Sequence, residues 1–383
     1  MFRTIMAIGT LMAACGGEMA LAQTADFQTQ GVTADNLPAY ADHLKQQLTF
    51  PLGWSSHVSD PAVWKTKARS KLWELTLQTA DQTQFNPHMI DEVDRGTYVA
   101  RKVAFNLTQH NRIIALMLVP KGKGPFPAAV FYHDHGSNFD IGKEKLIETW
   151  GDEARLISSQ GWGQKFFSGR FPGDELARRG YVVLATDALG WGDRGPLTYE
   201  AQQALAANFA NLGSSLAGSM ALEDVRAAAF LKSLPEVDKG RIAAIGFSMG
   251  AFRAWQAAAL SDDITATVAV NWMGTAKGLM VPGNNQLRGG SAWHMTHPGL
   301  MQHMDYPDVA SLAAPNSMLI LAGEKDTLFP PASVTEAFGK MKDVWAAWNA
   351  ADRFESKIWP GGHVFEADQQ DYAFDWLDRQ FGR

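Results

Sequence analysis

Residues 241–250 read RIAAIGFSMG, and this stretch decides the fold. Its first part, Arg241 to Ile245, is a short apolar run typical of a buried strand, and the alanine-rich residues 251–260 predict a helix. Between the two stands Ser248, at the centre of a Gly-x-Ser-x-Gly pattern. A serine at a sharp turn between strand and helix presents its hydroxyl above a sheet. The pattern is weak by itself, but this strand–turn–helix context is the one that it requires.

Other short apolar runs resemble residues 241–245 and predict the remaining strands, at residues 128–132, 181–186, 266–270, 317–321 and 355–358. Helical stretches separate them, at residues 173–179, 220–234, 251–260 and 334–349. Apolar strands that alternate with helices predict an α/β fold, with a mostly parallel central sheet and helices on both faces. Two alternating runs, residues 98–107 and 112–119, predict an N-terminal antiparallel hairpin at one edge.

The first 22 residues have the pattern of an export signal. Arg3 supplies a positive charge, an apolar run follows, and Ala20-Leu21-Ala22 is a cleavage site of small residues. The apolar run is too short to remain as a transmembrane segment. We therefore expect an exported protein, periplasmic or secreted. The only cysteine, Cys15, leaves lipoprotein anchoring open as the alternative; cleavage after Ala22 would leave no cysteine for a disulfide or a thiol nucleophile.

The remaining chain is expected to contain one catalytic domain behind an extension. Residues 23–97 form that extension, with a helix that begins at Asp60-Pro61, a capping residue followed by a first-turn proline. Residues 98–383 form the α/β catalytic domain. Two insertions, near 137–171 and 273–308, interrupt the alternation and are lid-like, since their aromatic content argues against disorder.

Composition excludes several classes of partner. The net charge is −6, and no run of Lys or Arg is present, so nucleic acids and anionic membrane surfaces are not expected to bind. With 46% hydrophobic and 19% charged residues, the chain has the composition of an ordinary globular protein. A small-molecule or oligosaccharide substrate remains the natural partner.

A serine nucleophile needs a base and an acid, which in this fold follow it in the order serine, acid, histidine. Asp326 comes just after the strand at 317–321 and is the expected acid, with Glu324 as its nearest competitor. His363 follows the last strand and is the expected general base. Asp326 would orient the imidazole and stabilise its charged form.

The oxyanion of a tetrahedral intermediate needs backbone N–H donors. Met249, directly after the nucleophile, is the first expected donor, and Gly136 or Ser137 the second. The loop that holds this second donor reads His133-Asp134-His135-Gly136-Ser137. Its His-x-His spacing also allows a metal site, but no further His/Asp set follows at a comparable interval. We expect these side chains to brace the loop, with no metal and no cofactor.

A second polar cluster follows the strand at 181–186. His135, Trp191 and Arg194 are the candidate substrate contacts, because this edge of an open sheet is where ligands bind. For Arg194, an ion pair with Asp187 or Asp193 that holds the loop is favoured over a contact with substrate. Glu223 and Asp224 are expected to be structural.

The motifs around Ser248, Asp326 and His363 resemble the catalytic triad of the α/β-hydrolase superfamily. A finer resemblance is to its dienelactone-hydrolase-like and acetyl xylan esterase-like branch, carried by residues 179–187, the Gly190-x-Gly192-x-Arg194 loop and residues 237–242. The resemblance covers residues 98–383 and implies ester hydrolysis without a cofactor, with removal of acyl groups from carbohydrate as one use.

The chain departs from that branch at two points. Dienelactone hydrolases proper use a cysteine nucleophile, whereas this chain has Ser248, which argues against dienelactone as the substrate. The loop at 133–136 also differs from the common His-Gly-Gly-Gly form. The leading hypothesis is therefore a serine carboxylic-ester hydrolase acting through an acyl-serine intermediate. A serine peptidase of the same fold is the alternative, and a binding protein without catalysis is a third.

Overall fold

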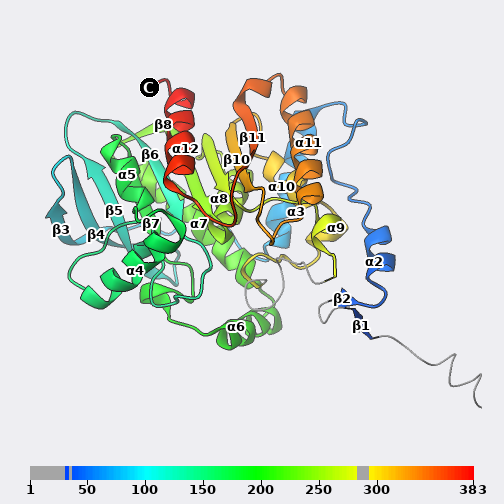
Figure 1. Ribbon diagram of the computed structural model, residues 1–383, viewed down its shortest axis with the longest axis horizontal. Helices are drawn as coiled ribbons and strands as arrows, with labels where there is room; N and C mark the ends of the chain where they lie inside the picture. Colours follow the sequence, from blue (N-terminus) through cyan, green and yellow to red (C-terminus); the bar gives the residue numbers. More distant parts are fainter. Residues whose placement is uncertain (1–30, 34–36, 283–292) are drawn as a thin grey trace, which may run out of the picture.

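The computed structural model describes residues 31–33, 37–282 and 293–383. The expected export signal at residues 1–22 and the possible lipid anchor at Cys15 lie outside these ranges. The described chain is built around a nine-stranded sheet in the order β11-β10-β9-β8-β6-β7-β5-β4-β3. Figure 1 shows this sheet running from β3 at the left to β11 toward the right.

The parallel part of the sheet contains all six predicted apolar strands: β6 (Phe126–Tyr132), β7 (Val182–Thr186), β8 (Val237–Phe247), β9 (Ala266–Val270), β10 (Ser317–Gly323) and β11 (Phe354–Trp359). Strand β8 lies inside the sheet, parallel to β6 on one side and to β9 on the other. Strand β8 therefore has a hydrogen-bonded neighbour on each side. Its carboxyl end, at Phe247, lies at the edge of the sheet where the parallel strands end.

The predicted hairpin is confirmed as β4 (Tyr98–Asn106) paired antiparallel with β5 (Arg112–Pro120). The structure adds an edge strand that the sequence did not predict, β3 (His88–Asp94), which pairs antiparallel with β4. This strand is exposed along almost its whole length and carries no apolar face, so hydrophobic periodicity could not reveal it.

Helices cover both faces of the sheet, as predicted. One face packs against α3 (Pro61–Leu75), α7 (Leu216–Ser233), α8 (Met249–Leu260), α10 (Tyr306–Ser311) and α11 (Pro331–Ala347). The other packs against α4 (Glu153–Phe166), α5 (Pro172–Arg178) and α12 (Ala367–Gln380). Alternate residues of β8 serve the two layers: Ile242 and Ala244 face the first core, Ala243 and Ile245 the second.

Shorter elements complete the described chain. They are β1 (Val32–Thr33), β2 (Leu37–Pro38), α2 (Ala41–Gln47), α6 (Tyr199–Asn211) and α9 (Ala276–Leu279), with short 3₁₀ turns at Lys143–Lys145, Gly192–Arg194, Leu300–Gln302 and Ala351–Arg353. The expected start of α3 is confirmed: the Asp60 carboxylate caps it by accepting from the N–H groups of Ala62 and Val63.

The insertion at 137–171 contains helix α4, and its Trp162 and Phe167 are buried in the core formed by α4, α5 and α12. Part of the insertion therefore packs against the sheet. In the insertion at 273–308, the described part includes α9 and α10, and α10 packs in the opposite core.

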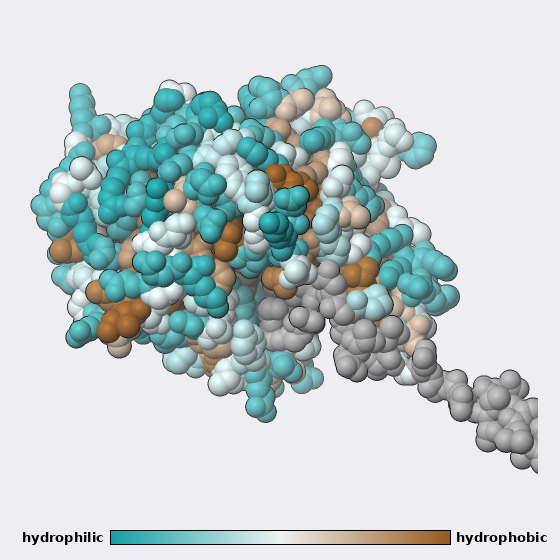
Figure 2. Space-filling model, in the orientation of Figure 1, coloured by the Kyte–Doolittle hydropathy of each residue, from teal (hydrophilic) through white to brown (hydrophobic). Residues whose placement is uncertain are grey.

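The surface is largely hydrophilic on the face shown in Figure 2, where hydrophobic residues occur in small separate areas. Within the described ranges, no helix has both the length and the hydropathy that crossing a membrane requires.

Candidate active site

Ser248 occupies a strained turn between β8 and α8. Its φ of 55° and ψ of −125° lie in a region that side-chain-bearing residues rarely adopt. The Ser248 N–H donates to the carbonyl of Val270 at 2.8 Å, which ties the turn to the end of β9. This is the geometry that presents a serine hydroxyl at the edge of a sheet.

The two glycines that flank Ser248 are required by close backbone packing. A Cβ on Gly246 would lie 2.0 Å from the carbonyl oxygen of Gly250, and one on Gly250 would lie 2.0 Å from that of Tyr132. Both distances are far below van der Waals contact with backbone atoms that cannot rotate away. The motif glycines therefore allow the turn to close and α8 to start against the end of β6.

Ser248, His363 and Asp326 form one hydrogen-bonded series. The Oγ of Ser248 lies 2.8 Å from Nε2 of His363, and Nδ1 of the same ring lies 2.7 Å from Oδ2 of Asp326. Asp326 follows β10 and His363 follows β11, so the parallel strands deliver all three side chains to one edge. The competing acid, Glu324, is exposed instead.

Neighbouring groups hold His363 in place. The side-chain amide of Asn271, at the end of β9, donates to the carbonyls of Gly362 at 3.3 Å and Val364 at 2.9 Å, on either side of the histidine. The Phe247 ring lies 4.8 Å from the imidazole, centroid to centroid. The sequence analysis did not identify Asn271. Its position directly after a predicted strand could have marked it as a residue near the site.

The expected oxyanion donors come from two elements that meet beside Ser248. Met249 begins α8, where N–H groups lack partners within the helix. In the loop after β6, Gly136 has a φ of +53°, and a Cβ there would lie 2.4 Å from the Trp162 ring. Ser137 is exposed, whereas His135 is buried. The tight contact with Trp162 explains why this loop carries a glycine.

The residues expected to contact substrate have partners within the protein. The side chain of His135 contacts Gln202 through Nε2 at 2.9 Å, and burial lowers its pKa to about 4. Trp191 is fully buried and donates through Nε1 to the carbonyl of His135 at 2.8 Å. These contacts brace the loop after β6 and leave neither side chain exposed to a ligand.

Arg194 forms a bidentate ion pair with Glu223, at 2.6 and 2.8 Å. The expected carboxylate partners, Asp187 and Asp193, were wrong, although Arg194 also donates to the backbone carbonyl of Asp187. The prediction of a structural role for Glu223 and Asp224 is confirmed, since Asp224 forms a second buried pair, with Arg253 of α8 at 2.7 and 3.0 Å. The first pair fastens α7 to the loop after β7, and the second fastens α7 to α8.

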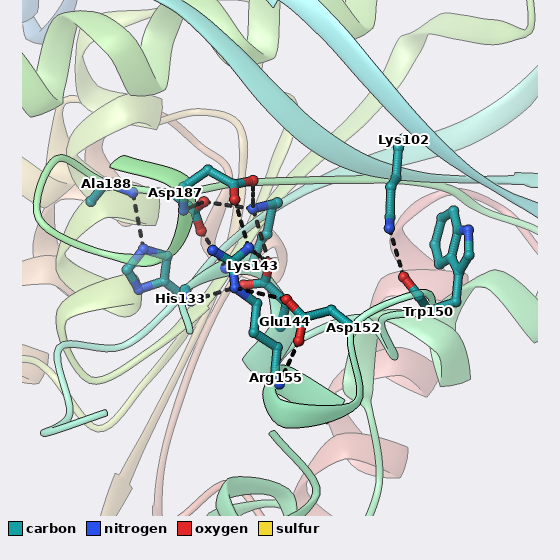
Figure 3. A network of polar contacts seen from close by, with 11 residues as sticks. Lys102, His133, Lys143, Glu144, Trp150, Asp152, Arg155, Asp187 and Ala188 are labelled. Carbon is teal, nitrogen blue, oxygen red and sulfur yellow. Dashed lines mark hydrogen bonds and ion pairs between the residues drawn. The ribbon is translucent and has the colours of Figure 1, made fainter. Parts of the chain in front are cut away.

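Asp187 instead contacts the buried ammonium group of Lys143 (Figure 3). Asp193 contacts the same group. Lys143 Nζ lies 2.6 Å from Asp187, 2.7 Å from Asp193 and 3.0 Å from Glu144. Burial alone would lower the pKa of Lys143, but the surrounding carboxylates outweigh it and hold that pKa above its usual value. The sequence analysis did not identify Lys143 or its neighbour Lys145. Their charges, within an insertion rich in aromatic residues, could have marked them as buried polar residues.

No metal is needed to explain the histidines of the loop. His133 is buried, with Nδ1 2.8 Å from the carbonyl of Asp134, and its Nε2 accepts from the N–H of Ala188 at 3.0 Å. Among the described residues, the cluster with metal-like spacing is Glu144, Asp187 and Asp193. The ammonium of Lys143 already lies within hydrogen-bond distance of all three.

Comparisons with known proteins find a hydrolase family and a related hydrolase. The model of the dienelactone hydrolase family matches residues 156–375, a segment that includes Ser248, Asp326 and His363. A hydrolase of Bacillus subtilis (strain 168) named YtaP is 28% identical over 300 residues, covering 78% of this chain and 94% of that protein.

Two solved structures share the fold. One, described as an acetyl xylan esterase from Bacteroides fragilis NCTC 9343, superposes with a TM-score of 0.66 at 17% identity, covering 84% of this chain and 82% of that chain. The other, a glucuronoyl esterase from Teredinibacter turnerae T7901, has a TM-score of 0.60 at 14% identity, covering 95% and 98%. At these identities, the likeness is one of fold.

Proposed function

The chain belongs to the dienelactone hydrolase family, and from that premise we propose that it is a serine carboxylic-ester hydrolase acting through an acyl-serine intermediate. The observation that carries the proposal is the hydrogen-bonded series from Ser248 through His363 to Asp326, at 2.8 and 2.7 Å. A serine with an adjacent base, itself oriented by an acid, is the arrangement that activates a hydroxyl as a nucleophile.

In the proposed first half-reaction, the Oγ of Ser248 attacks the ester carbonyl carbon while Nε2 of His363 takes its proton. The carbonyl oxygen becomes an oxyanion, which accepts hydrogen bonds from the N–H of Met249 and from the loop after β6. Collapse of this intermediate breaks the bond to the alcohol oxygen, and the imidazolium returns the proton to that oxygen. The acyl group is left on Ser248.

In the second half-reaction, water takes the place of the alcohol. His363 accepts a proton from the water as it attacks the acyl carbon. The bond between the acyl carbon and Oγ then breaks, His363 returns the proton to the Oγ of Ser248, and the carboxylic acid is released. Throughout, Asp326 accepts from Nδ1–H of the ring, which keeps Nε2 free to exchange the proton. No metal or cofactor takes part in this scheme.

We further propose that the substrates are acylated carbohydrates met outside the cytoplasm. Support comes from the shared fold with proteins described as acetyl xylan and glucuronoyl esterases. The export pattern of residues 1–22, which the structure does not describe, supports the location. A panel of acetylated, feruloylated and methyl-esterified sugars, run beside simple aryl esters, would separate a carbohydrate esterase from a general esterase.

The test of the chemistry is the hydrolysis of p-nitrophenyl acetate by wild type and Ser248→Ala. We expect the substitution to lower kcat by at least about 10⁴-fold, as removal of a triad nucleophile does. Ser233→Ala is a matched control, because that hydroxyl bonds only to the carbonyl of Phe230 within α7. Equal turnover by Ser248→Ala would overturn the proposal. Cleavage of aminoacyl amides without cleavage of esters would favour a serine peptidase.

A further inference from the structure

Two successive carbonyls of the loop after β6 accept from one buried ammonium group. Lys145 Nζ lies 3.3 Å from the carbonyl oxygen of Asp134 and 3.0 Å from that of His135. The carbonyl of His135 also accepts from Nε1 of Trp191 at 2.8 Å. Successive carbonyls of a strand alternate in direction, so their convergence on one atom marks a local turn with both oxygens on one side.

The carbonyls determine where the following N–H groups point. In a planar trans peptide, the N–H of the next residue points opposite to the C=O. Carbonyls held toward Lys145 therefore direct the N–H groups of His135 and Gly136 to the other side of the loop. Neither N–H donates a hydrogen bond to any residue that the structure describes. Consecutive N–H groups directed to one side of a loop, with a left-handed residue such as Gly136 at a φ of +53°, are an arrangement by which a backbone can bind an anion.

This loop lies directly against the start of the nucleophile helix. A Cβ on Gly250 would be 2.0 Å from the carbonyl of Tyr132 and 3.1 Å from that of His133. Arg253, one turn further along α8, reaches the His133 carbonyl at 3.5 Å. The loop and the first turn of α8, with the N–H of Met249, are therefore fixed as one unit beside Ser248.

We propose that Lys145 is a positioning residue of the oxyanion hole, holding the carbonyls of Asp134 and His135 so that the N–H groups of His135 and Gly136 face the acyl carbonyl. The proposal rests on the esterase function proposed above. It adds His135 to the candidate donors and gives Ser137 no role, because the carbonyl that precedes Ser137 lies near Nδ1 of His135 rather than Lys145.

The surroundings of Lys145 suit this role. The residue is fully buried, and its three N–H groups face three acceptors: the two carbonyls and the Asp134 carboxylate at 3.4 Å. The Trp162 ring lies 4.6 Å from Nζ and covers the ammonium on another side. A cation that donates to a carbonyl also polarises the peptide, which strengthens the N–H on its far side.

The test is Lys145→Met, which keeps the aliphatic stem and removes the donors. Turnover is measured on an aryl ester and on the matching thionoester, whose C=S accepts hydrogen bonds poorly. We expect kcat for the oxygen ester to fall on the order of 10- to 100-fold, below the loss for deleting a donor outright, with KM nearly unchanged. The thionoester should slow much less, so the ratio of the two rates should fall at least several-fold.

Trp191→Phe is a second variant that acts on the same peptide group, since it removes the Nε1–H donor to the His135 carbonyl, together with part of the buried ring, and leaves Lys145 in place. If Lys145→Met does not fold, this variant tests the positioning role in its place. We expect the ratio of the oxygen-ester rate to the thionoester rate to fall in the same direction. Trp345→Phe is the matched control, because this buried indole donates to the carbonyl of Asn316, at the amino end of β10. Its rate ratio should equal that of wild type.

Equal slowing of the ester and the thionoester, or no slowing of either, would overturn the positioning role. Failure of the esterase proposal would look different. Wild type itself would then show no turnover that depends on Ser248, whatever residue stands at position 145.

Discussion

The carboxylate of Asp326 lies 2.7 Å from Nδ1 of His363, although the two residues follow different strands and are 37 positions apart. The Asp326 side chain is 1% exposed, and its second oxygen accepts from the N–H of Leu328 at 3.0 Å. This contact requires a proton on Nδ1 and leaves Nε2 as the atom that can accept from Ser248. The pair therefore fixes the tautomer on which the proposed chemistry depends.

Replacing Asp326 with Asn should keep the hydrogen-bond length and disturb that tautomer. We expect Asp326→Asn to lower kcat on p-nitrophenyl acetate by about 10⁴-fold with little change in KM, because the ring can no longer accept the serine proton at Nε2. Glu324→Gln, at the exposed neighbouring acid, is the control and should retain wild-type rates. Loss of activity in the control alone would reassign the acid to Glu324.

The sequence was most informative where local pattern and chemistry coincide. The apolar run before Ser248 and the helix after it predicted a strand–turn–helix, and the structure contains β8 and α8 at those positions. Asp326 and His363 could be placed because parallel strands all end at one edge, so a polar residue just past a strand lies near the site. These inferences needed only local sequence and one topological rule.

Partners across the fold could not be inferred in the same way. Arg194 pairs with Glu223 rather than with the nearby Asp193, since helix α7 brings a carboxylate from 29 positions away. Lys145 looks like a surface residue in the sequence and is fully buried in the structure. Hydrophobic periodicity reports which face of an element is apolar, but it carries no information about which distant charges meet.

The glycine before the nucleophile should tolerate no side chain. Gly246→Ala would place a Cβ 2.0 Å from the Gly250 carbonyl, so the turn must shift. We expect a loss of about 3 kcal/mol in the free energy of unfolding, measured by denaturant titration, together with loss of activity. Gly161→Ala in α4 is the matched control: nothing lies within 4 Å of its added Cβ, and it should stabilise by about 0.5–1 kcal/mol.

The buried ammonium of Lys143 should matter more to stability than any surface cation. Lys143→Met would remove the ammonium that Asp187, Asp193 and Glu144 share, leaving Arg155 to pair with Asp193 and Glu144. Breaking a buried ion pair by removing one partner costs about 3–5 kcal/mol, and we expect a loss of that size in denaturant titration. The loops after β6 and β7 would loosen, so activity should fall as well.

Lys121→Met is the matched control for that measurement, because Lys121 pairs with Asp94 at the surface, where an ion pair adds little. We expect no measurable change in its unfolding midpoint. Wild-type activity should also be insensitive to a chelator such as EDTA, since Lys143 and Arg155, rather than a metal ion, face the three carboxylates. Inhibition that added metal reverses would contradict this assignment.

Stability should decrease in mild acid because histidines are buried in the neutral form. Burial lowers the pKa of His297 to about 4, whereas a histidine in the unfolded chain titrates near about 6.5. Between these values the unfolded state binds more protons than the folded state, so the free energy of unfolding falls as the pH falls. From His297 alone we expect a loss of about 2 kcal/mol between about pH 7 and about pH 4.5, measured by denaturant titration at each pH.

His297→Asn keeps a donor for Gln256, which lies 2.6 Å from the ring, but cannot titrate, so its stability should vary less with pH. The slope should be reduced rather than abolished, because burial also lowers the pKa of His135 to about 4 and that of His294 to about 3. Parallel stability curves for wild type and His297→Asn over this range would show that His297 is not buried as a neutral ring.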